Sequence, residues 1–392
     1  MKGRIAILLN GPIKNDYRVI KTINTLLKVA EIDLFYIDGD QTADQKLFEE
    51  RVVLHAFEHP INFKTKLLRH SFFCREFLHF HKAIEKTGKQ FDVIWANDLP
   101  SLLPAYKTAK KQNAKLVYDS HEIYLETLNQ FFPRQAKFPK TIVFKLLLTL
   151  MKLHGGIVEK RLIRRVDHFI TVNQSLLAFF KAKYTVRIAT VIYNYPKSLS
   201  GEVVPVDYRK LFNWKGSDII LIYQGVLNEG RGLHLLLETL DHLQQKFKLI
   251  IVGDGPIRSQ LETYSLQHDL KERVKFIGMV PLNELPSYTT GADIGVNLLE
   301  DLNISKKLAS PNKLFEYIQG GVPILCSSTI ENNRILDQYD IGISIKNEVP
   351  NIIDGINELE QKLKIKDQDT FLTASKNLNW EHQESQLLSI LS

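Results

Sequence analysis

Short apolar runs alternate with longer amphipathic stretches along almost the whole chain of 392 residues. Short apolar runs between turn signals indicate buried strands, whereas apolar residues spaced three or four apart indicate helices. The alternation predicts an α/β fold, with parallel sheets that carry helices on both faces. The expected strands are 4–9, 32–37, 52–56, 93–96, 115–118, 168–172 and 189–193, then 219–223, 248–252, 274–277, 294–297 and 323–326. The expected helices are 19–29, 67–84, 99–111, 233–244, 258–268, 282–290 and 312–318.

The alternation is interrupted near residues 195–217, where the segment 195–201 reads YPKSLSG and has the composition of a linker. A chain of this length suggests two domains of about 150–200 residues each. We therefore expect two consecutive doubly wound, Rossmann-like domains, residues 1–197 and 198–375. Ligands of such sheets bind outside the carboxyl ends of the strands, so two domains facing each other would line a cleft with their binding loops.

Composition narrows the class of protein. The apolar fraction of 44% and the charged fraction of 24% are those of a globular protein. Cys74 and Cys326 are far apart in the sequence and lie among apolar residues, which favours buried free thiols over a disulfide framework or a metal site. We expect a reducing, cytoplasmic location. The apolar run 5–9 is too short for the core of a signal peptide and is read as the first strand.

The positive charge of the chain, +7 in total, is concentrated in one stretch, residues 134–165. An apolar helix rimmed with Lys and Arg can lie in the headgroup layer of an anionic membrane, but this one is too short and too charged to span it. An interior helix with basic flanks is the alternative. Nucleic acid is not an expected partner, because no nucleic-acid-binding module accompanies the charge. The basic residues, opposed only by Glu159, are Arg134, Lys137, Lys140, Lys145, Lys152, Lys160, Arg161, Arg164 and Arg165.

A short helix with clear ends is expected in the segment SPNKLFEYIQGG, residues 310–321. Ser310 is expected as its N-cap, Pro311 as its first residue and the two glycines as its stop. The amino end of a helix attracts anions, and Lys313 adds a full charge there. Glu316 lies about one turn further on, where a carboxylate can accept hydrogen bonds from sugar hydroxyls. A capped core helix with a surface ion pair is the alternative, and the residues alone do not decide between the two.

Glycine-rich segments follow two of the expected strands. GVLNEGRG, residues 225–232, lets the backbone approach a diphosphate, which Arg231 can bind through two hydrogen bonds. Its spacing differs from the GxGxxG fingerprint of dinucleotide-binding domains, and an ordinary strand-to-helix turn is the alternative. Gly253 and Gly255 form a second tight turn in IIVGDGP, and Phe276-Ile277-Gly278 ends a strand whose backbone can read a base edge.

These elements, in this order, resemble the donor-binding domain of family-4 retaining glycosyltransferases of the GT-B fold. The first half also resembles this family, in the segments NDYRV, FDVIWAND, VYDSHE and VIYNYP. NWE at 379–381 resembles the start of the family's last helix, so residues 376–392 are expected to cross back to the first domain. The resemblance implies an enzyme of glycan or lipid-linked glycoconjugate assembly that uses a UDP-, GDP- or ADP-sugar and no cofactor, in the cytoplasm or on the inner face of the plasma membrane.

The resemblance also implies roles for individual residues. Glu316 matches the acid that holds the donor ribose, Arg231 a lysine that contacts the diphosphate, and His121 the histidine near the transferred sugar. Arg231, Lys313 and the helix tip would neutralise the leaving diphosphate without a metal ion. The expected donor-binding residues are Gly225, Arg231, Gly253, Gly255, Phe276, Ile277, Pro311, Asn312, Lys313 and Glu316. The expected acceptor-side residues are Gly11, Asp16, Arg18, Asn97, Asp98 and Glu122.

Two positions depart from the family pattern. The first glutamate of its E-x7-E motif would fall at Leu308, and an arginine of the first glycine-rich loop is replaced by Val226. Asn312 and Lys313 are the expected substitutes. The missing acid leaves a catalytically inactive nucleotide-sugar-binding protein as an alternative, next to a nucleotide-sugar epimerase.

Overall fold

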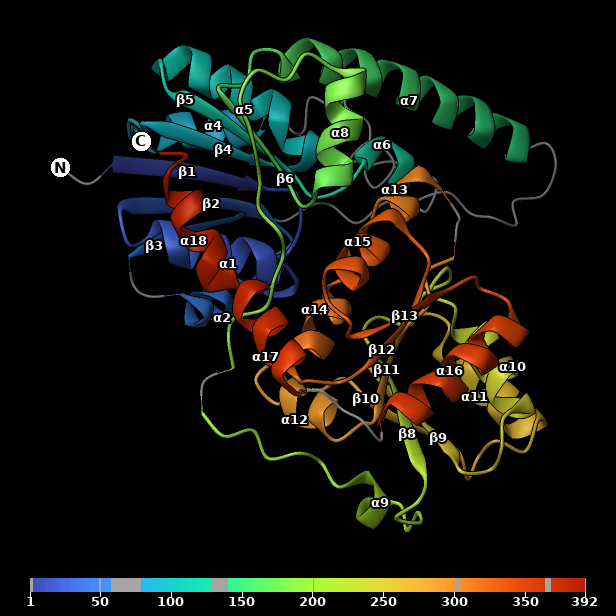
Figure 1. The fold of residues 1–392 in the computed structure, drawn as a ribbon. Coiled ribbons are helices and arrows are strands. Elements are labelled where there is room, and N and C mark those ends of the chain that lie inside the picture. The colour runs from blue at the N-terminus through green and yellow to red at the C-terminus, as the bar shows by residue number, and fades with distance from the viewer. Residues whose placement is uncertain are drawn as a thin grey trace. The chain divides into compact units, whose positions relative to one another are not determined.

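The computed structural model describes residues 3–48, 51–57, 79–128, 140–199, 201–300, 303–363 and 368–391. The chain divides into two compact units, one of Met1–Tyr193 with Gln383–Ser392 and one of Asn194–His382. The expected boundaries at residues 197 and 375 fall a few residues inside the second unit. Each unit is built on a parallel sheet with helices on both faces (Figure 1), so the expected α/β fold is confirmed.

The first unit has a seven-stranded sheet in the order β3-β2-β1-β4-β5-β6-β7. The chain builds the sheet outward from β1 in both directions, so the topology switches between β1 and β4, where doubly wound sheets bind their ligands. The central strands are mostly apolar because helices cover both faces. The strands are β1 (Gly3–Leu9), β2 (Ala30–Ile37), β3 (Val52–Phe57), β4 (Val93–Asn97), β5 (Lys115–Ser120), β6 (His168–Thr171) and β7 (Ala189–Val191).

Among the described residues of the first unit the longest helix is α7, which lies beside α5 and α6 along the outside of the unit (Figure 1). No helix among the described residues is long and apolar enough to cross a membrane. The helices are α1 (Tyr17–Leu26), α2 (Gln41–Asp44), α4 (His79–Lys86), α5 (Asp98–Gln112), α6 (Tyr124–Thr127), α7 (Lys140–Ile163) and α8 (Gln174–Lys183).

The second unit has a six-stranded parallel sheet in the order β10-β9-β8-β11-β12-β13 and repeats the switch, here between β8 and β11. The strands are β8 (Ile219–Gln224), β9 (Phe247–Val252), β10 (Val274–Gly278), β11 (Ile294–Asn297), β12 (Ile324–Ser327) and β13 (Gly342–Ile345). The helices are α9 (Tyr208–Leu211), α10 (Leu233–His242), α11 (Arg258–Gln267), α12 (Leu285–Thr290), α13 (Ile304–Lys307), α14 (Asn312–Gln319), α15 (Ile330–Gln338), α16 (Val349–Leu363) and α17 (Gln368–Asn377).

The last helix, α18 (Trp380–Leu388), begins in the second unit and ends in the first. Within the first unit, Gln383 accepts a hydrogen bond from the backbone of Tyr193 at 3.0 Å, and Glu384 pairs with Lys28 at 2.6 Å. The chain terminus is therefore tied to the α1 end of the first unit by polar contacts as well as by burial of Leu387 and Ile390.

Some of the expected features lie outside the described residues, and one strand of the structure was not expected. The expected helix 67–84 overlaps α4, but its part before His79 is not described, and neither is Cys74. Cys326 is a buried free thiol, and burial raises its pKa to about 12. The edge strand β13 was not expected, because its short sequence GISI gives little periodic signal.

Candidate active site

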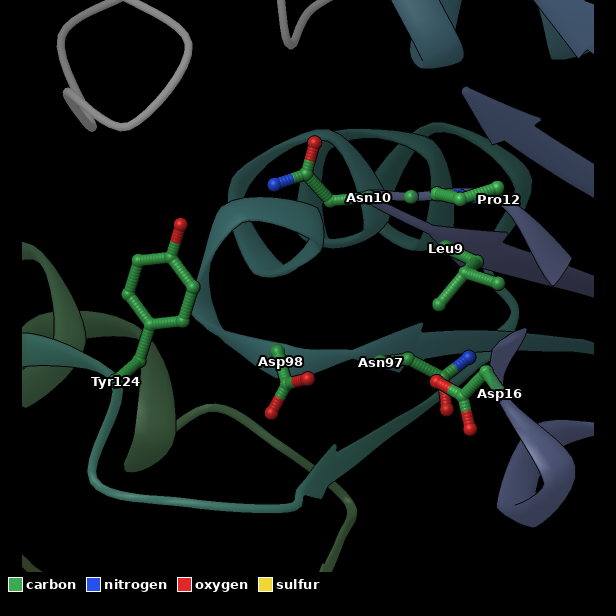
Figure 2. A pocket seen from close by; sticks show the side chains of 8 residues that line it. Leu9, Asn10, Pro12, Asp16, Asn97, Asp98 and Tyr124 are labelled. Carbon is green, nitrogen blue, oxygen red and sulfur yellow. The ribbon is translucent and has the colours of Figure 1, made fainter. Parts of the chain in front are cut away.

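A pocket of about 210 Å³ lies at the topological switch of the first unit. It is lined by the chain after β1 and by the start of α5 after β4, with Tyr124 of α6 on the opposite side from Asp16 (Figure 2). Four of the six expected acceptor-side residues line it: Gly11, Asp16, Asn97 and Asp98. Glu122 lies just beyond, in the half-buried loop after β5, where its backbone carbonyl accepts a hydrogen bond from Ser120.

The polar groups of this pocket are mostly hydrogen-bond acceptors. Asp16 is the N-cap of α1 and accepts from the backbone of Val19 at 3.0 Å. Asn97 donates its amide hydrogen to the carbonyl of Leu8 at 3.1 Å. The amide oxygens of Asn10 and Asn97 are buried and have no hydrogen-bond partner among the described residues. Buried acceptors without a donor cost free energy, so a ligand that offers hydroxyl groups would be stabilised here.

His121 lies between two carboxylates at the end of β5. Its Nδ1 lies 3.5 Å from Asp98, its Nε2 lies 3.4 Å from Asp119, and its backbone donates to Asp98 at 2.9 Å. Asp98 has a φ of 58°, which is unusual for a residue other than glycine and is typical of functional sites. Burial disfavours protonation of the imidazole, but the two carboxylates outweigh it and raise the pKa of His121 to about 9. The side chain is therefore an imidazolium at neutral pH.

Arg18, which was expected on the acceptor side, is not among the residues that line this pocket. Its side chain is only 4% exposed and forms an ion pair with Asp119 at 2.9 Å. It also donates to the backbone carbonyl of Ile192 at 2.6 Å, just after β7. Although burial opposes ionisation, Arg18 and His121 hold the pKa of Asp119 well below its usual range. Arg18 thus positions the carboxylate that faces His121, and a buried guanidinium needs such a partner.

The glycine-rich loops of the second unit pack against each other at the carboxyl ends of β8 and β9. Gly225 and Gly253 have φ angles of 123° and 132°, which side chains rarely adopt. A Cβ at Gly253 would come within 2.0 Å of the carbonyl oxygen of Gly225, and one at Gly255 within 2.4 Å of that of Leu227. The two loops can come this close only because glycine stands at these positions. Their backbones therefore lie together at the carboxyl edge of the sheet.

Lys313 is a buried amino group in a cationic environment. Its Nζ lies 3.3 Å from the centre of the Tyr223 ring, and its side chain also borders Gly225. Burial lowers the pKa of Lys313 well below its usual value, Arg231 and Lys306 lower it further, and only Glu316 opposes them. A buried ammonium group beside two other cations is unfavourable unless an anion joins them. Because its side chain is buried, Lys313 does not belong to a surface ion pair, and an anion bound beside it would be stabilised.

Glu316 is held by a chain of hydrogen bonds that the sequence analysis missed. Thr289 donates to the amide oxygen of Gln224 at 2.9 Å, and the amide nitrogen of Gln224 donates to the carboxylate of Glu316. Gln224 ends β8 and Thr289 belongs to α12, so two separate elements orient the acid. The neighbouring Tyr317 is buried, and its hydroxyl contacts the carbonyls of Ile222 and Val296, which fixes α14 over β8 and β11.

The start of α14 differs from the expectation. The N-cap is Pro311 and not Ser310, with Asn312 as the first residue of the helix. Since Pro311 offers no side-chain cap, the first backbone N–H groups of the helix lack a side-chain acceptor at that position. Asn312 accepts a hydrogen bond from Asn194 at 2.9 Å. Leu308 follows α13 and is buried, so an apolar side chain fills the place where an acid was expected from the resemblance.

Phe276 and Ile277 end β10 and are half-buried. The carbonyl of the following Gly278 accepts from the backbone of Gly253 at 2.7 Å, which brings the ends of β9 and β10 together. Among the described residues no group of three or more His, Cys, Asp or Glu side chains is arranged to hold a metal ion. Each unit presents polar and charged residues at the carboxyl edge of its sheet, mostly acceptors around His121 in the first and basic side chains around Glu316 in the second.

Two family models match the chain, and between them they cover most of it. Glycosyltransferase Family 4 matches residues 30–195, and Glycosyl transferases group 1 matches residues 207–377. A curated relative, the amylovoran biosynthesis glycosyltransferase AmsK of Erwinia amylovora, is 32% identical over 106 residues. That match spans 26% of this chain and 26% of the relative.

Solved structures of similar fold cover nearly the whole chain. HepE of Anabaena in complex with UDP and glucose has a TM-score of 0.70 at 18% identity and covers 99% of each chain. Sucrose-phosphate synthase of Thermosynechococcus elongatus has a TM-score of 0.72 at 15% identity and covers 99% of this chain and 98% of its own. At these identities the likeness concerns the fold. Together with the two family matches, it shows that the chain belongs to the glycosyltransferases of the GT-B type.

Proposed function

We propose that the protein transfers a sugar from a nucleotide-sugar donor to a glycan or lipid-linked acceptor, with retention of the anomeric configuration. The observation that carries this proposal is the buried Lys313, which shares the carboxyl edge of the second sheet with Arg231 and lies near Glu316. The three neighbouring basic side chains of Lys313, Arg231 and Lys306 suit a diphosphate, and the oriented carboxylate of Glu316 suits the ribose hydroxyls.

The comparisons support a UDP-sugar as the first donor to test, before GDP- and ADP-sugars. HepE has been solved with UDP and with UDP-glucose. AmsK is named for the biosynthesis of amylovoran, which supports a role in assembling cell-surface polysaccharide, lipopolysaccharide or a related glycoconjugate. We propose that this work takes place at the inner face of the plasma membrane, where a lipid-linked acceptor would be met.

In the proposed reaction the bond between the anomeric carbon and the diphosphate oxygen breaks while the acceptor hydroxyl attacks from the same face. The acceptor proton passes to the leaving phosphate oxygen. Arg231, Lys313 and the amino end of α14 neutralise the charge that develops on the diphosphate, in place of a metal ion. The proposed base contacts are the backbone groups of Phe276 and Ile277, with Gly225, Gly253 and Gly255 beside the phosphates.

The pocket of the first unit is the proposed acceptor site. The carboxylates of Asp16 and Asp98 and the free amide oxygens of Asn10 and Asn97 all accept hydrogen bonds, which suits sugar hydroxyls. The imidazolium of His121 is the one proposed catalytic cation on this side. It would donate a hydrogen bond to a hydroxyl of the sugar being transferred and so position it. A protonated imidazole cannot act as a base, so it would not take the acceptor proton.

Binding and turnover with a panel of UDP-, GDP- and ADP-sugars test the proposed function. We expect one donor class to bind in saturation-transfer NMR and to transfer its sugar, with activity unchanged in EDTA. If no nucleotide sugar binds, the proposal is wrong. Binding without transfer would favour the inactive binding protein that Leu308 suggests, and conversion of the donor to an epimer without any acceptor would favour an epimerase.

Replacing Glu316 by alanine is expected to weaken donor binding by about tenfold or more, because hydrogen bonds to a charged group contribute about 1.5–3 kcal/mol. Isothermal titration with the nucleotide-sugar measures the affinity. Glu272→Ala is the matched control, since its side chain is 85% exposed in the same unit. Equal donor affinity in Glu316→Ala and in the control would remove Glu316 from the ribose site.

A further inference from the structure

We propose that helix α7 docks the protein on an anionic lipid surface, a role that rests on the proposed transfer to a lipid-linked acceptor. The helix carries five apolar side chains that are between 42% and 63% exposed. Their spacing of four, four, three and four residues aligns them on one face of an α-helix. These residues, the α7 stripe, are Ile142, Leu146, Leu150, Leu153 and Ile157.

The opposite face of α7 is firmly attached to the first unit. Met151 and Leu162 are buried in its core. Glu159 is buried as well, and its carboxyl group accepts hydrogen bonds from the hydroxyls of Tyr118 at 3.2 Å and Tyr184 at 2.5 Å. These contacts fix the rotation of α7 about its own axis. The α7 stripe therefore stays on the solvent side of the helix and cannot be buried by rotation. Exposed apolar area of this extent usually marks an interaction surface.

The charged residues around the α7 stripe indicate that its partner is anionic. Glu159 is the only acid between Lys140 and Arg165, and it faces the core. Lys160 and Arg161 follow Ile157 at three and four residues, so they continue the stripe at its carboxyl end, and the exposed Arg164 comes directly after the helix. Among the described residues, the solvent face of α7 is mostly apolar and cationic and carries no acid, which matches the anionic headgroups and acyl boundary of a lipid layer.

The α7 stripe is coupled to the proposed acceptor pocket through α6. Lys152 of α7 pairs with Glu126 of α6 at 3.0 Å, and Tyr124 of the same short helix lines the pocket. All of these residues belong to the first unit. A helix seated in the headgroup layer would therefore hold the pocket close to the membrane surface, where the sugar of a lipid-linked acceptor is found.

Flotation of the full chain with vesicles of phosphatidylcholine alone, or with phosphatidylglycerol added, tests the docking face. We expect binding only to the anionic vesicles. The combined variant Leu146→Gln, Leu150→Gln, Leu153→Gln is expected to weaken it by about tenfold or more, as is Lys160→Gln, Arg161→Gln, Arg164→Gln. Leu266→Gln, an apolar helix residue that is 64% exposed in the second unit, should bind like the wild type.

Circular dichroism and nucleotide-sugar affinity show whether each variant is folded. Retained donor binding with lost flotation supports the docking face, and this readout does not depend on acceptor turnover. Absence of binding to anionic vesicles, or equal binding by the leucine variant and the wild type, would overturn it. Light scattering that shows a dimer which the leucine variant abolishes, without vesicle binding, would overturn it in favour of a second copy of the chain.

Discussion

Replacing Lys313 by methionine is expected to lower glycosyl transfer by about 10²-fold to 10³-fold while making the ligand-free protein more stable. The loss of activity follows from the proposed role of the Lys313 ammonium in neutralising the leaving diphosphate. The gain in stability follows from its surroundings, where the ammonium is buried against Tyr223 and near Arg231 and Lys306. Methionine fills a similar volume without a charge, so the free energy of unfolding should rise by about 1 kcal/mol or more.

The pH dependence of stability provides a second readout for Lys313. A lysine whose pKa is lowered by burial destabilises the folded chain fully at pH values below that lowered pKa. The destabilisation is relieved as pH rises from the lowered pKa toward the ordinary lysine value. Wild-type protein should therefore gain stability relative to Lys313→Met over this range, as measured by chemical denaturation at each pH.

An exposed lysine of the same unit gives the control for these measurements. Lys271→Met removes the same charge from the surface, at the end of the sheet remote from the glycine-rich loops, and should change neither activity nor stability appreciably. Lower stability of Lys313→Met, or unchanged transfer, would show that Lys313 is a structural lysine. Saturating nucleotide sugar should stabilise the wild type more than Lys313→Met, because only the wild type gains an anion beside a buried ammonium.

The sequence could predict the two doubly wound sheets because each strand is a short apolar run with a clear turn after it. Such local signals do not depend on distant residues, so strands such as β1, β8 and β9 were found within a residue or two. Local signals also identified the glycine-rich loops. Gly225 and Gly253 have φ angles above 100°, which residues with a side chain rarely adopt. The edge strand β13 is short and has few neighbours, and it was missed.

The site was less predictable because its geometry depends on contacts between remote elements. Gln224 and Thr289 are separated by 65 residues, and neither resembles a functional residue until the fold brings them to Glu316. Arg18 was expected on the acceptor side, and the sequence did not indicate that it is buried in an ion pair with Asp119, 101 residues away. In both cases the outcome depends on which side chains are buried. A pattern in one sequence does not predict burial for an individual polar side chain.

His121 provides the second large expected effect. Its replacement by glutamine should reduce transfer by about 10²-fold, because the neutral amide forms a weaker hydrogen bond to the transferred sugar than the charged imidazolium does. In the wild type, kcat/KM should fall on the alkaline side as pH passes through about 9, the pKa set by Asp98 and Asp119. Asp98→Asn removes one of the two carboxylates, so it should move this fall to lower pH.

The free energy of unfolding should also depend on the ionisation of His121. Because the pKa of His121 is raised in the folded protein, its contribution to stability should decrease as pH rises. The two carboxylates stabilise the folded protein fully at pH values below the ordinary histidine pKa of about 6.5, and this contribution disappears as pH rises through about 9. Lys313 changes the pH dependence of stability with the opposite sign, but it is present in both proteins. The difference in unfolding free energy between wild type and His121→Gln therefore isolates the contribution of His121. His268→Gln is the control, because that histidine pairs with Asp241 at 2.9 Å on the surface of the second unit. An alkaline limit of activity that Asp98→Asn leaves in place would show that His121 is not the group responsible.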